Sequence, residues 1–325
     1  MRKMRGGSPA TRQNHAHLGP LVFALAAILA GKGPAFAASP RQDAQKQTPG
    51  IRVQVNLVNI YATVIDASGR PVPDLTQDAF ELKEEGVPQK IERFEAQTNR
   101  PLDLALMVDS SLSTYKDLKF EAEAAAHFIS QIVRPGDTVS VFQFSETVTQ
   151  LSDFSENVPA LQSAARKISP GSGTSMYDAI VLASQTLRRR PADRRRAIVL
   201  VTDAGETTSV SKFEDARRWA VAAETLIYAV VIRPVKNENG RNTAGEHALI
   251  TIMDSAGGDF FILDELNQLD SIFDRINREL RTQYLLGYYP TSPPPPRMLR
   301  HVQLNVKSGD TVRYRSQYFT AAAPK

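Results

Sequence analysis

Hydrophobic and polar positions change their period twice along the chain. Over residues 51–65, apolar residues alternate with polar ones and change phase once near Asn59, which predicts a strand with a bulge. Two shorter alternating runs follow, separated by a turn at Glu85-Gly86. Residues 51–98 are therefore predicted to form a small all-β segment.

From residue 99 to residue 283, apolar runs of strand length alternate with helical periodicity. The predicted strands are residues 102–108, 138–144, 197–202, 226–232 and 260–263. Apolar residues between them recur at helical spacing, and residues 147–151 are expected to add a short antiparallel edge strand. This pattern predicts an α/β domain, with a doubly wound, mostly parallel sheet covered by helices on both faces.

Strand periodicity returns over residues 284–319. Neither this segment nor residues 51–98 is large enough to bury a good core alone. We therefore expect the two flanks to pair into one discontinuous all-β domain beside the α/β domain.

The first 37 residues have the pattern of a signal peptide. They combine basic residues with an apolar stretch of about 13 residues, short of the roughly 20 that span a membrane, and the small-residue pattern Ala35-Phe36-Ala37. Residues 38–50 are polar and are predicted to be a linker. We expect an exported protein, periplasmic or extracellular, with no membrane span after cleavage; an uncleaved anchor is the alternative.

Composition excludes several functions. Five of the 39 Lys and Arg residues and none of the 35 Asp and Glu residues lie in the first 37 residues, so the remainder is nearly neutral. A neutral chain has no overall electrostatic attraction to nucleic acid. The chain has no cysteine, which excludes thiol nucleophiles, Cys-ligated zinc and disulfides.

Polar side chains follow two of the buried strands. Asp109, Ser111 and Ser113 come directly after strand 102–108, Asp203 follows strand 197–202, and Thr174 ends a glycine-rich stretch before a helix. The carboxyl ends of parallel strands form the ligand crevice of an open α/β sheet. Two carboxylates and three hydroxyls suit Mg²⁺ or Mn²⁺ rather than zinc. The Asp-Ser-Ser cluster alone is also compatible with a helix cap and turn.

The order D-x-S-x-S, G-T and T-D resembles the von Willebrand factor A domain over residues 99 to 281, and the five residues resemble its metal-ion-dependent adhesion site. The resemblance implies that Ser111 and Ser113 bind the metal directly and that Thr174 binds directly or through water. Asp109 and Asp203 would act mostly through water. The expected ion is Mg²⁺, with Mn²⁺ or Ca²⁺ as alternatives.

Two departures from the family pattern affect the loops. The usual T-D-G is Thr202-Asp203-Ala204-Gly205 here, and the usual G-G-T is Gly171-Ser172-Gly173-Thr174. Residues 64–72 and 284–290 resemble the flanks of secreted bacterial proteins related to this family. The resemblance implies a non-enzymatic module whose metal binds an Asp or Glu of a partner protein; a structural component of the cell envelope, with the metal stabilising the fold, is the alternative.

Two short motifs in the sequence also suggest an enzyme. Ser113 to Lys116 matches S-x-x-K, and Lys307-Ser308-Gly309 is close to K-T-G, as in penicillin-recognising hydrolases. The second motif lies in a predicted hairpin turn, and no His and acid pair suggests a triad, so no enzyme is predicted. The arginine-rich stretch 188–196 is expected to be a solvated helix end, or else a contact with an anionic surface.

Overall fold

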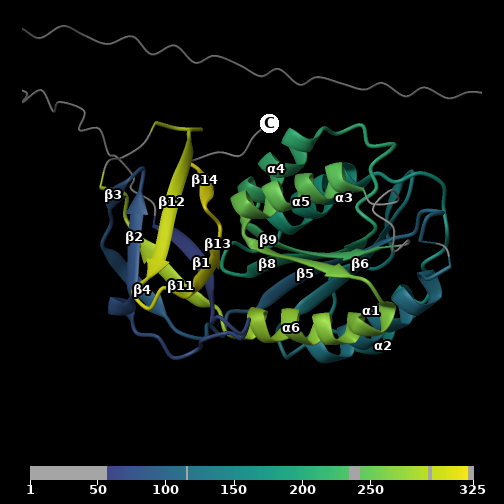
Figure 1. Ribbon diagram of the computed structural model, residues 1–325, viewed down its shortest axis with the longest axis horizontal. Helices are drawn as coiled ribbons and strands as arrows, with labels where there is room; N and C mark the ends of the chain where they lie inside the picture. The colour runs from purple at the N-terminus through teal and green to yellow at the C-terminus, as the bar shows by residue number, and fades with distance from the viewer. Residues whose placement is uncertain (1–56, 115, 234–241, 292–294, 321–325) are drawn as a thin grey trace, which may run out of the picture. The chain divides into compact units, whose positions relative to one another are not determined.

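The computed structural model describes residues 57–114, 116–233, 242–291 and 295–320 (Figure 1). The predicted signal peptide, the predicted linker and residues 51–56 lie outside this part. Within it, no helix combines the length and the apolar character needed to cross a bilayer.

A six-stranded sheet forms the centre of the α/β domain, with the strand order β10-β9-β8-β5-β6-β7. Its strands are β5 (Leu102–Asp109), β6 (Thr138–Phe144), β7 (Val148–Gln150), β8 (Arg195–Thr202), β9 (Thr225–Ile232) and β10 (Gly258–Leu263). All neighbours are parallel except β7, which pairs antiparallel with β6 at the edge. The predicted mostly parallel sheet is confirmed.

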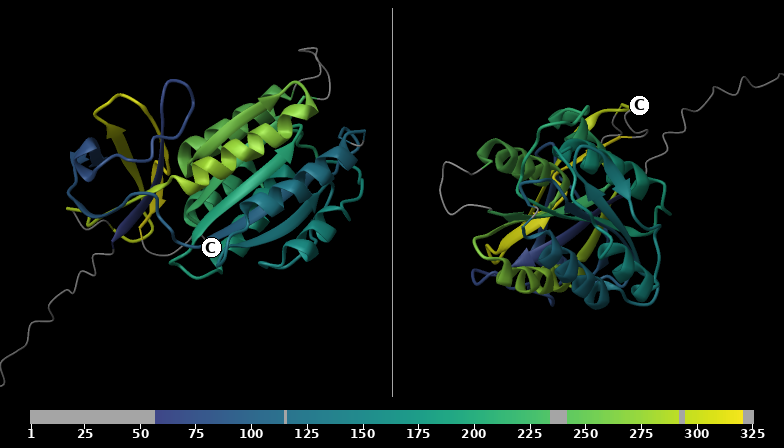
Figure 2. Two further views of the ribbon diagram at one scale, coloured as in Figure 1. Left: turned by 90° about the horizontal axis from the view of Figure 1, so that it is seen from below. Right: turned by 90° about the vertical axis from the view of Figure 1, so that its right-hand side faces the viewer.

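Helices cover both faces of this sheet (Figure 1). One layer holds α1 (Leu118–Ile132), α2 (Val158–Ala165) and α6 (Leu269–Arg281), and the other holds α3 (Met176–Arg188), α4 (Phe213–Ala222) and α5 (Thr243–Ala256). Figure 2 shows the two layers from other sides. Along β5, Leu104 and Leu106 join the core under α1, whereas Ala105 and Met107 join the core under α3. This alternation is why residues 104–108 of β5 are apolar at every position rather than at every second one.

Both flanks of the α/β domain contribute strands to two smaller sheets, with the orders β13-β1-β11-β4 and β14-β12-β2-β3. The N-terminal strands are β1 (Val58–Ile65), β2 (Phe80–Glu84), β3 (Val87–Pro88) and β4 (Ile91–Glu95). The C-terminal strands are β11 (Tyr284–Tyr288), β12 (Leu299–Val306), β13 (Thr311–Tyr314) and β14 (Gln317–Phe319). Single 3-10 turns occur at Gln77–Ala79 and Leu266–Gln268.

Pairing between the flanks is direct. β1 lies between β11 and β13, and β12 pairs with β2, in each case antiparallel. The bulge expected near Asn59 is wrong, because β1 keeps a continuous register with β11, and the irregularity lies instead between Gly287 and Tyr288 on the β4 side. The predicted all-β part built from both flanks is therefore present.

The arginine-rich stretch divides in two: Arg188 and Arg189 are exposed, as expected of a solvated helix end, whereas the arginines that follow have partners inside the chain. Arg190 and Arg194 pair with the fully buried carboxylate of Asp103 at 3.0 and 2.7 Å. Arg195 is itself buried and donates to the carbonyl of Arg100 at 2.8 Å. A buried acid at the second position of β5 gives these cations an internal partner, which the charge pattern alone did not indicate.

Candidate metal centre

Asp109 is the last residue of β5 and is fully buried. Its carboxylate accepts a hydrogen bond from the hydroxyl of Thr202, with 2.7 Å between Oγ1 and Oδ2, and another from the backbone N–H of Ser111 at 2.9 Å. Thr202 ends β8, the neighbour of β5 in the sheet. These contacts hold the carboxylate between two strand ends.

The loop after β5 brings two serine hydroxyls together. The Oγ atoms of Ser111 and Ser113 lie 2.9 Å apart, with Ser111 buried and Ser113 exposed. Thr114 holds the loop, because its hydroxyl lies 3.2 and 3.0 Å from the carbonyl oxygens of Asp109 and Ser111. The hydroxyl pair therefore reaches from the interior to the solvent.

The glycine-rich loop before α3 is held from two sides. The N–H of Gly171 donates to the carbonyl of Ser110 at 2.8 Å, and a Cβ on Gly171 would lie 2.3 Å from Oγ of Ser145, so the close approach requires glycine. The N–H of Thr174 donates to Oγ1 of Thr207 at 2.8 Å. Thr174 is buried, and its backbone is fixed at the same sheet edge as Asp109.

Asp203 and Thr174 border the same small space beside Gly205. The N–H of Gly205 donates to Oδ1 of Asp203 at 2.8 Å. A Cβ at position 205 would lie 2.8 Å from that oxygen and 3.5 Å from Oγ1 of Thr174. A side chain here would fill the space between the two oxygens, so the glycine that follows Ala204 keeps this space open.

The strand order explains why the five predicted ligands converge. β5 and β8 are adjacent and parallel, yet the chain leaves β5 toward α1 on one face and leaves β8 toward α4 on the other. Such a divergence opens a crevice at the carboxyl edge of an α/β sheet. The structure places Asp109, Ser111, Ser113, Thr174 and Asp203 at this edge.

Two acidic side chains, Asp109 and Asp203, lie at the site. Burial raises the pKa of Asp109 to about 6; hydrogen bonds from Thr202 and Ser111 oppose that rise, and the charge of Asp203 adds to it. Among the described residues, neither Asp109 nor Asp203 forms an ion pair. Two carboxylates with three hydroxyls and no internal countercharge fit a hard divalent cation.

The departure from T-D-G has a visible effect on the backbone. Ala204 adopts φ of 61°, the left-handed conformation that favours glycine, and it is buried. Its neighbour Asp203 nevertheless keeps its oxygen beside Thr174. The alanine therefore strains the backbone while Asp203 and Thr174 still border the same space.

Two residues of this region were missed as functional candidates from the sequence. Thr202 was noted only as the residue before Asp203, although its hydroxyl binds Asp109. Glu121 lies in the first turn of α1 and is buried among the apolar positions of that helix. The signal that could have found it is an acidic residue on the apolar stripe, between Leu118 and Ala125.

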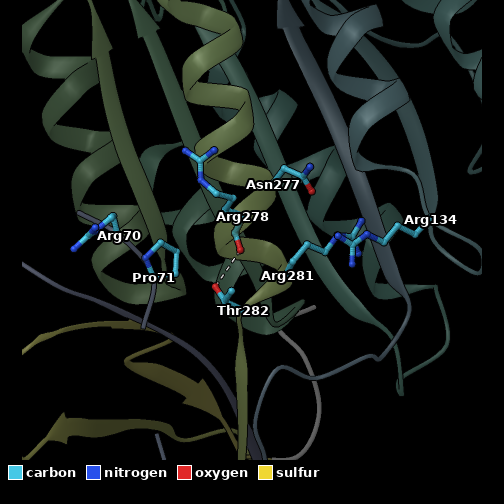
Figure 3. Close-up of a pocket in the computed structure, with 7 residues that line it drawn as sticks. All are labelled: Arg70, Pro71, Arg134, Asn277, Arg278, Arg281 and Thr282. Atoms are coloured by element: carbon cyan, nitrogen blue, oxygen red, sulfur yellow. Dashed lines mark hydrogen bonds between the residues drawn. The ribbon is translucent and has the colours of Figure 1, made fainter. Parts of the chain in front are cut away.

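A separate hollow of about 360 Å³ lies at the other edge of the sheet, around the end of α6. Figure 3 shows its lining residues, which are Arg70, Pro71, Arg134, Asn277, Arg278, Arg281 and Thr282. Arg281 is paired with Asp137 at 2.7 Å, so part of this positive charge is balanced within the chain. The hollow is not part of the acidic site.

Residues 104–206, which lie within the α/β part of the chain, match the family model of the von Willebrand factor type A domain. This stretch includes all five predicted ligands. No curated protein matches the chain.

Three solved bacterial structures are similar to the chain. BatB from Bacteroides thetaiotaomicron is 16% identical, with a TM-score of 0.43, over 55% of this chain and 98% of that one. A von Willebrand factor type A protein from Catenulispora acidiphila is 11% identical, with a TM-score of 0.49, over 82% of this chain and 74% of that one. The pilus adhesin SpaC from Lactobacillus rhamnosus GG is 10% identical, with a TM-score of 0.47, over 80% of this chain and 49% of that one.

Proposed function

We propose that this chain is an exported, non-enzymatic module that binds a partner protein through a divalent metal ion. The observation that carries the proposal is that five oxygen-bearing side chains lie at the β5 and β8 edge, where two buried acids have no ion-pair partner among the residues that the structure describes. The signal-peptide pattern of residues 1–37 supports export.

Charge balance favours an acidic group on the partner. Asp109 and Asp203 together offset the charge of a divalent ion, whereas the hydroxyls of Ser111, Ser113 and Thr174 are neutral. An ion held by neutral direct ligands stays electrophilic, and bound Mg²⁺ commonly completes its shell with oxygens from outside the protein. A carboxylate of Asp or Glu supplies such an oxygen, as the family resemblance implies.

The surroundings of the exposed serine suit a protein contact. Leu112, between the two serines, is 66% exposed, and Val210, in the loop after β8, is 92% exposed. Apolar side chains beside a polar centre are typical of protein interfaces. We propose that these two loops form the rim of the binding face.

Calorimetric titration with Mg²⁺ and Mn²⁺ tests whether the site binds a divalent metal ion. We expect saturable binding of one ion by the wild type and none by Asp109→Ala, which loses a buried carboxylate of the site. Ser130→Ala, which removes an exposed hydroxyl on α1 away from the site, should bind like the wild type. Absence of binding by the wild type, or equal binding by Asp109→Ala, would refute the proposal.

Chelation separates the binding module from the structural alternative. A binding module loses its partner in EDTA while it stays folded, whereas a purely structural ion leaves together with the fold. Capture of partners from a cell-envelope extract with and without EDTA, using wild type, Ser111→Ala and Ser130→Ala, provides the comparison. Circular dichroism of the same samples shows whether the chain remains folded.

A further inference from the structure

Glu121 is an acidic residue without a hydrogen-bond or ion-pair partner in the described part of the chain. It is 1% exposed, and neither of its carboxyl oxygens has a hydrogen-bond partner. Buried polar side chains are almost always hydrogen-bonded, and an exception calls for an explanation such as an ion or ordered water. An isolated ionised carboxylate away from water is far more costly still.

The position of Glu121 connects it to the candidate metal centre. The loop that carries Ser111 and Ser113 continues straight into α1, and the hydroxyl of Thr114 ties this junction to the carbonyl of Asp109 at 3.2 Å. The N–H of Leu118 donates to the carbonyl of Thr114 at 3.0 Å, and Glu121 lies one turn further along the helix. The buried acid is therefore placed directly behind the serine loop.

The charges around Glu121 are negative. Burial, together with the charges of Asp109, Asp117 and Asp203, raises its pKa to about 8. No lysine, arginine or histidine pairs with it within the described residues. The positive end of α1 favours an acid in this turn but does not supply a partner for its oxygens.

We propose that Glu121 is a third acidic residue of the metal site, placed behind Asp109, where it balances the charge of the bound cation without being one of the five predicted ligands. This inference rests on the proposed function. It explains why a helix whose neighbouring inward positions are apolar keeps one unpaired carboxyl group. Glu121 acts as a positioning residue, through water or through Asp109, and not through contact with the partner protein.

Calorimetric titration with Mn²⁺ at pH 8 tests the inference. Glu121→Gln keeps the shape and removes the charge, and we expect its Kd for Mn²⁺ to rise by about 10 to 100-fold, as for other residues that support metal ligands. Glu123→Gln is the matched control, because Glu123 lies on the exposed side of the same helix and pairs with Arg166 at 3.0 Å. It should bind Mn²⁺ as the wild type does.

The outcomes separate this inference from the proposed function. If Glu121→Gln binds Mn²⁺ like the wild type while Asp109→Ala does not, the role of Glu121 is refuted and the metal site stands. If the wild type itself does not bind Mn²⁺, both are refuted. An equal loss of affinity in Glu123→Gln would also refute a specific role for Glu121.

Thermal unfolding distinguishes a role of Glu121 in metal binding from a role in packing alone. Glu121→Leu removes the unpaired carboxyl group, so without metal at pH 8 we expect it to unfold at the wild-type temperature or above. Its gain in unfolding temperature on adding Mn²⁺ should be smaller than that of the wild type. A variant that loses stability equally with and without Mn²⁺ would show that Glu121 serves packing alone and would overturn the inference.

Discussion

Ala204 shows how a single residue at the candidate site departs from the geometry that its side chain prefers. Its φ of 61° is one that residues with a Cβ adopt at a cost of about 1 to 2 kcal/mol. Glycine would adopt it freely, although glycine loses more backbone entropy on folding, about 0.5 to 1 kcal/mol. The balance favours glycine at this position.

We predict that Ala204→Gly raises the free energy of unfolding by up to about 1 kcal/mol. Urea denaturation of the wild type and the variant measures this difference in the free energy of unfolding. Ala220→Gly is the control of opposite sign, because Ala220 lies inside α4, where glycine costs about 1 kcal/mol. A loss of stability in both variants would show that the backbone at Ala204 is not strained.

At this scale, the sequence indicated candidate ligands but not the contacts that hold them in place. Asp109, Ser111 and Asp203 could be proposed because each follows an apolar strand in a fixed order. The hydrogen bond from Thr202 to Asp109 could not, because it depends on β5 and β8 being neighbours although they are far apart in sequence. Glu121 was missed because a helical pattern indicates which positions are buried and not which partners they meet.

Two buried acids, Glu121 in α1 and Asp109 at the end of β5, should make the stability of the metal-free protein depend on pH. In the folded chain the pKa of Glu121 is raised to about 8 and that of Asp109 to about 6, above their ordinary values of 4.5 and 3.8. Between about pH 5 and pH 8 the folded state therefore holds protons that the unfolded state has released. Stability is then greatest at the acidic end of this window and falls as the pH rises.

We predict that, in EDTA, the free energy of unfolding falls between pH 5 and pH 8, at up to about 1.4 kcal/mol per pH unit for each such proton. Urea denaturation at several pH values measures the slope. Glu121→Gln should have a shallower slope, and Glu123→Gln the wild-type slope. A wild-type stability that does not change across this range would contradict the prediction.

The start of β5 is stabilised by charge pairing at the edge opposite the candidate site. Asp103 accepts hydrogen bonds from Arg190, Arg194 and the hydroxyl of Thr138, the last at 2.6 Å. Removing one partner of a buried ion pair is strongly destabilising, because the other charges remain without compensation.

We predict that Asp103→Ala lowers the free energy of unfolding by about 3 kcal/mol or more. The exposed Asp193→Asn, in the same arginine-rich stretch, should change it by less than about 0.5 kcal/mol. Folded Asp103→Ala should still bind Mn²⁺ with wild-type affinity, because the ion pairs and the acidic site lie at opposite edges. Equal stability of the two variants would contradict the prediction.

At the scale of elements, periodicity predicted the six-stranded sheet, including the antiparallel β7. It misplaced the irregularity of the β part, because the phase change near Asn59 marks a strand that is buried on both faces after Ala62 and not a bulge. It also did not indicate the partner of Arg190 and Arg194, because Asp103 lies far away in the sequence, in β5.

At the scale of the whole molecule, three cores divide the described residues. Two lie on the two faces of the six-stranded sheet, and the third combines residues of both flanks, among them Ile60, Phe80 and Tyr284. The flank core is joined to the α/β domain by Arg313, which pairs with Asp259 at 2.8 Å. Each core should therefore respond differently to loss of the C-terminal flank.

We predict that deleting residues 284–325 leaves the α/β domain folded and removes protection from the N-terminal strands, because β1 loses both of its neighbours and β2 loses β12. Hydrogen exchange on the truncated chain measures both parts. The fragment 100–282 is the control and should keep the protection of β5 and β8. Unchanged protection of residues 58–95 would contradict a β core shared between the flanks.

The central position of β1 also sets an order of events during synthesis. Val58 is made long before its partner Tyr288, and Ile65 before Thr311, so the strand that emerges first is completed last. The α/β domain can close as soon as α6 has been made, which reverses the usual sequence in which the N-terminal part of a chain folds first. Until then β1 presents an apolar strand with two open edges, the form of chain most prone to pair with a neighbouring copy. A chain whose synthesis ended before residue 284 would have a finished α/β domain and a β1 strand with no partner on either side.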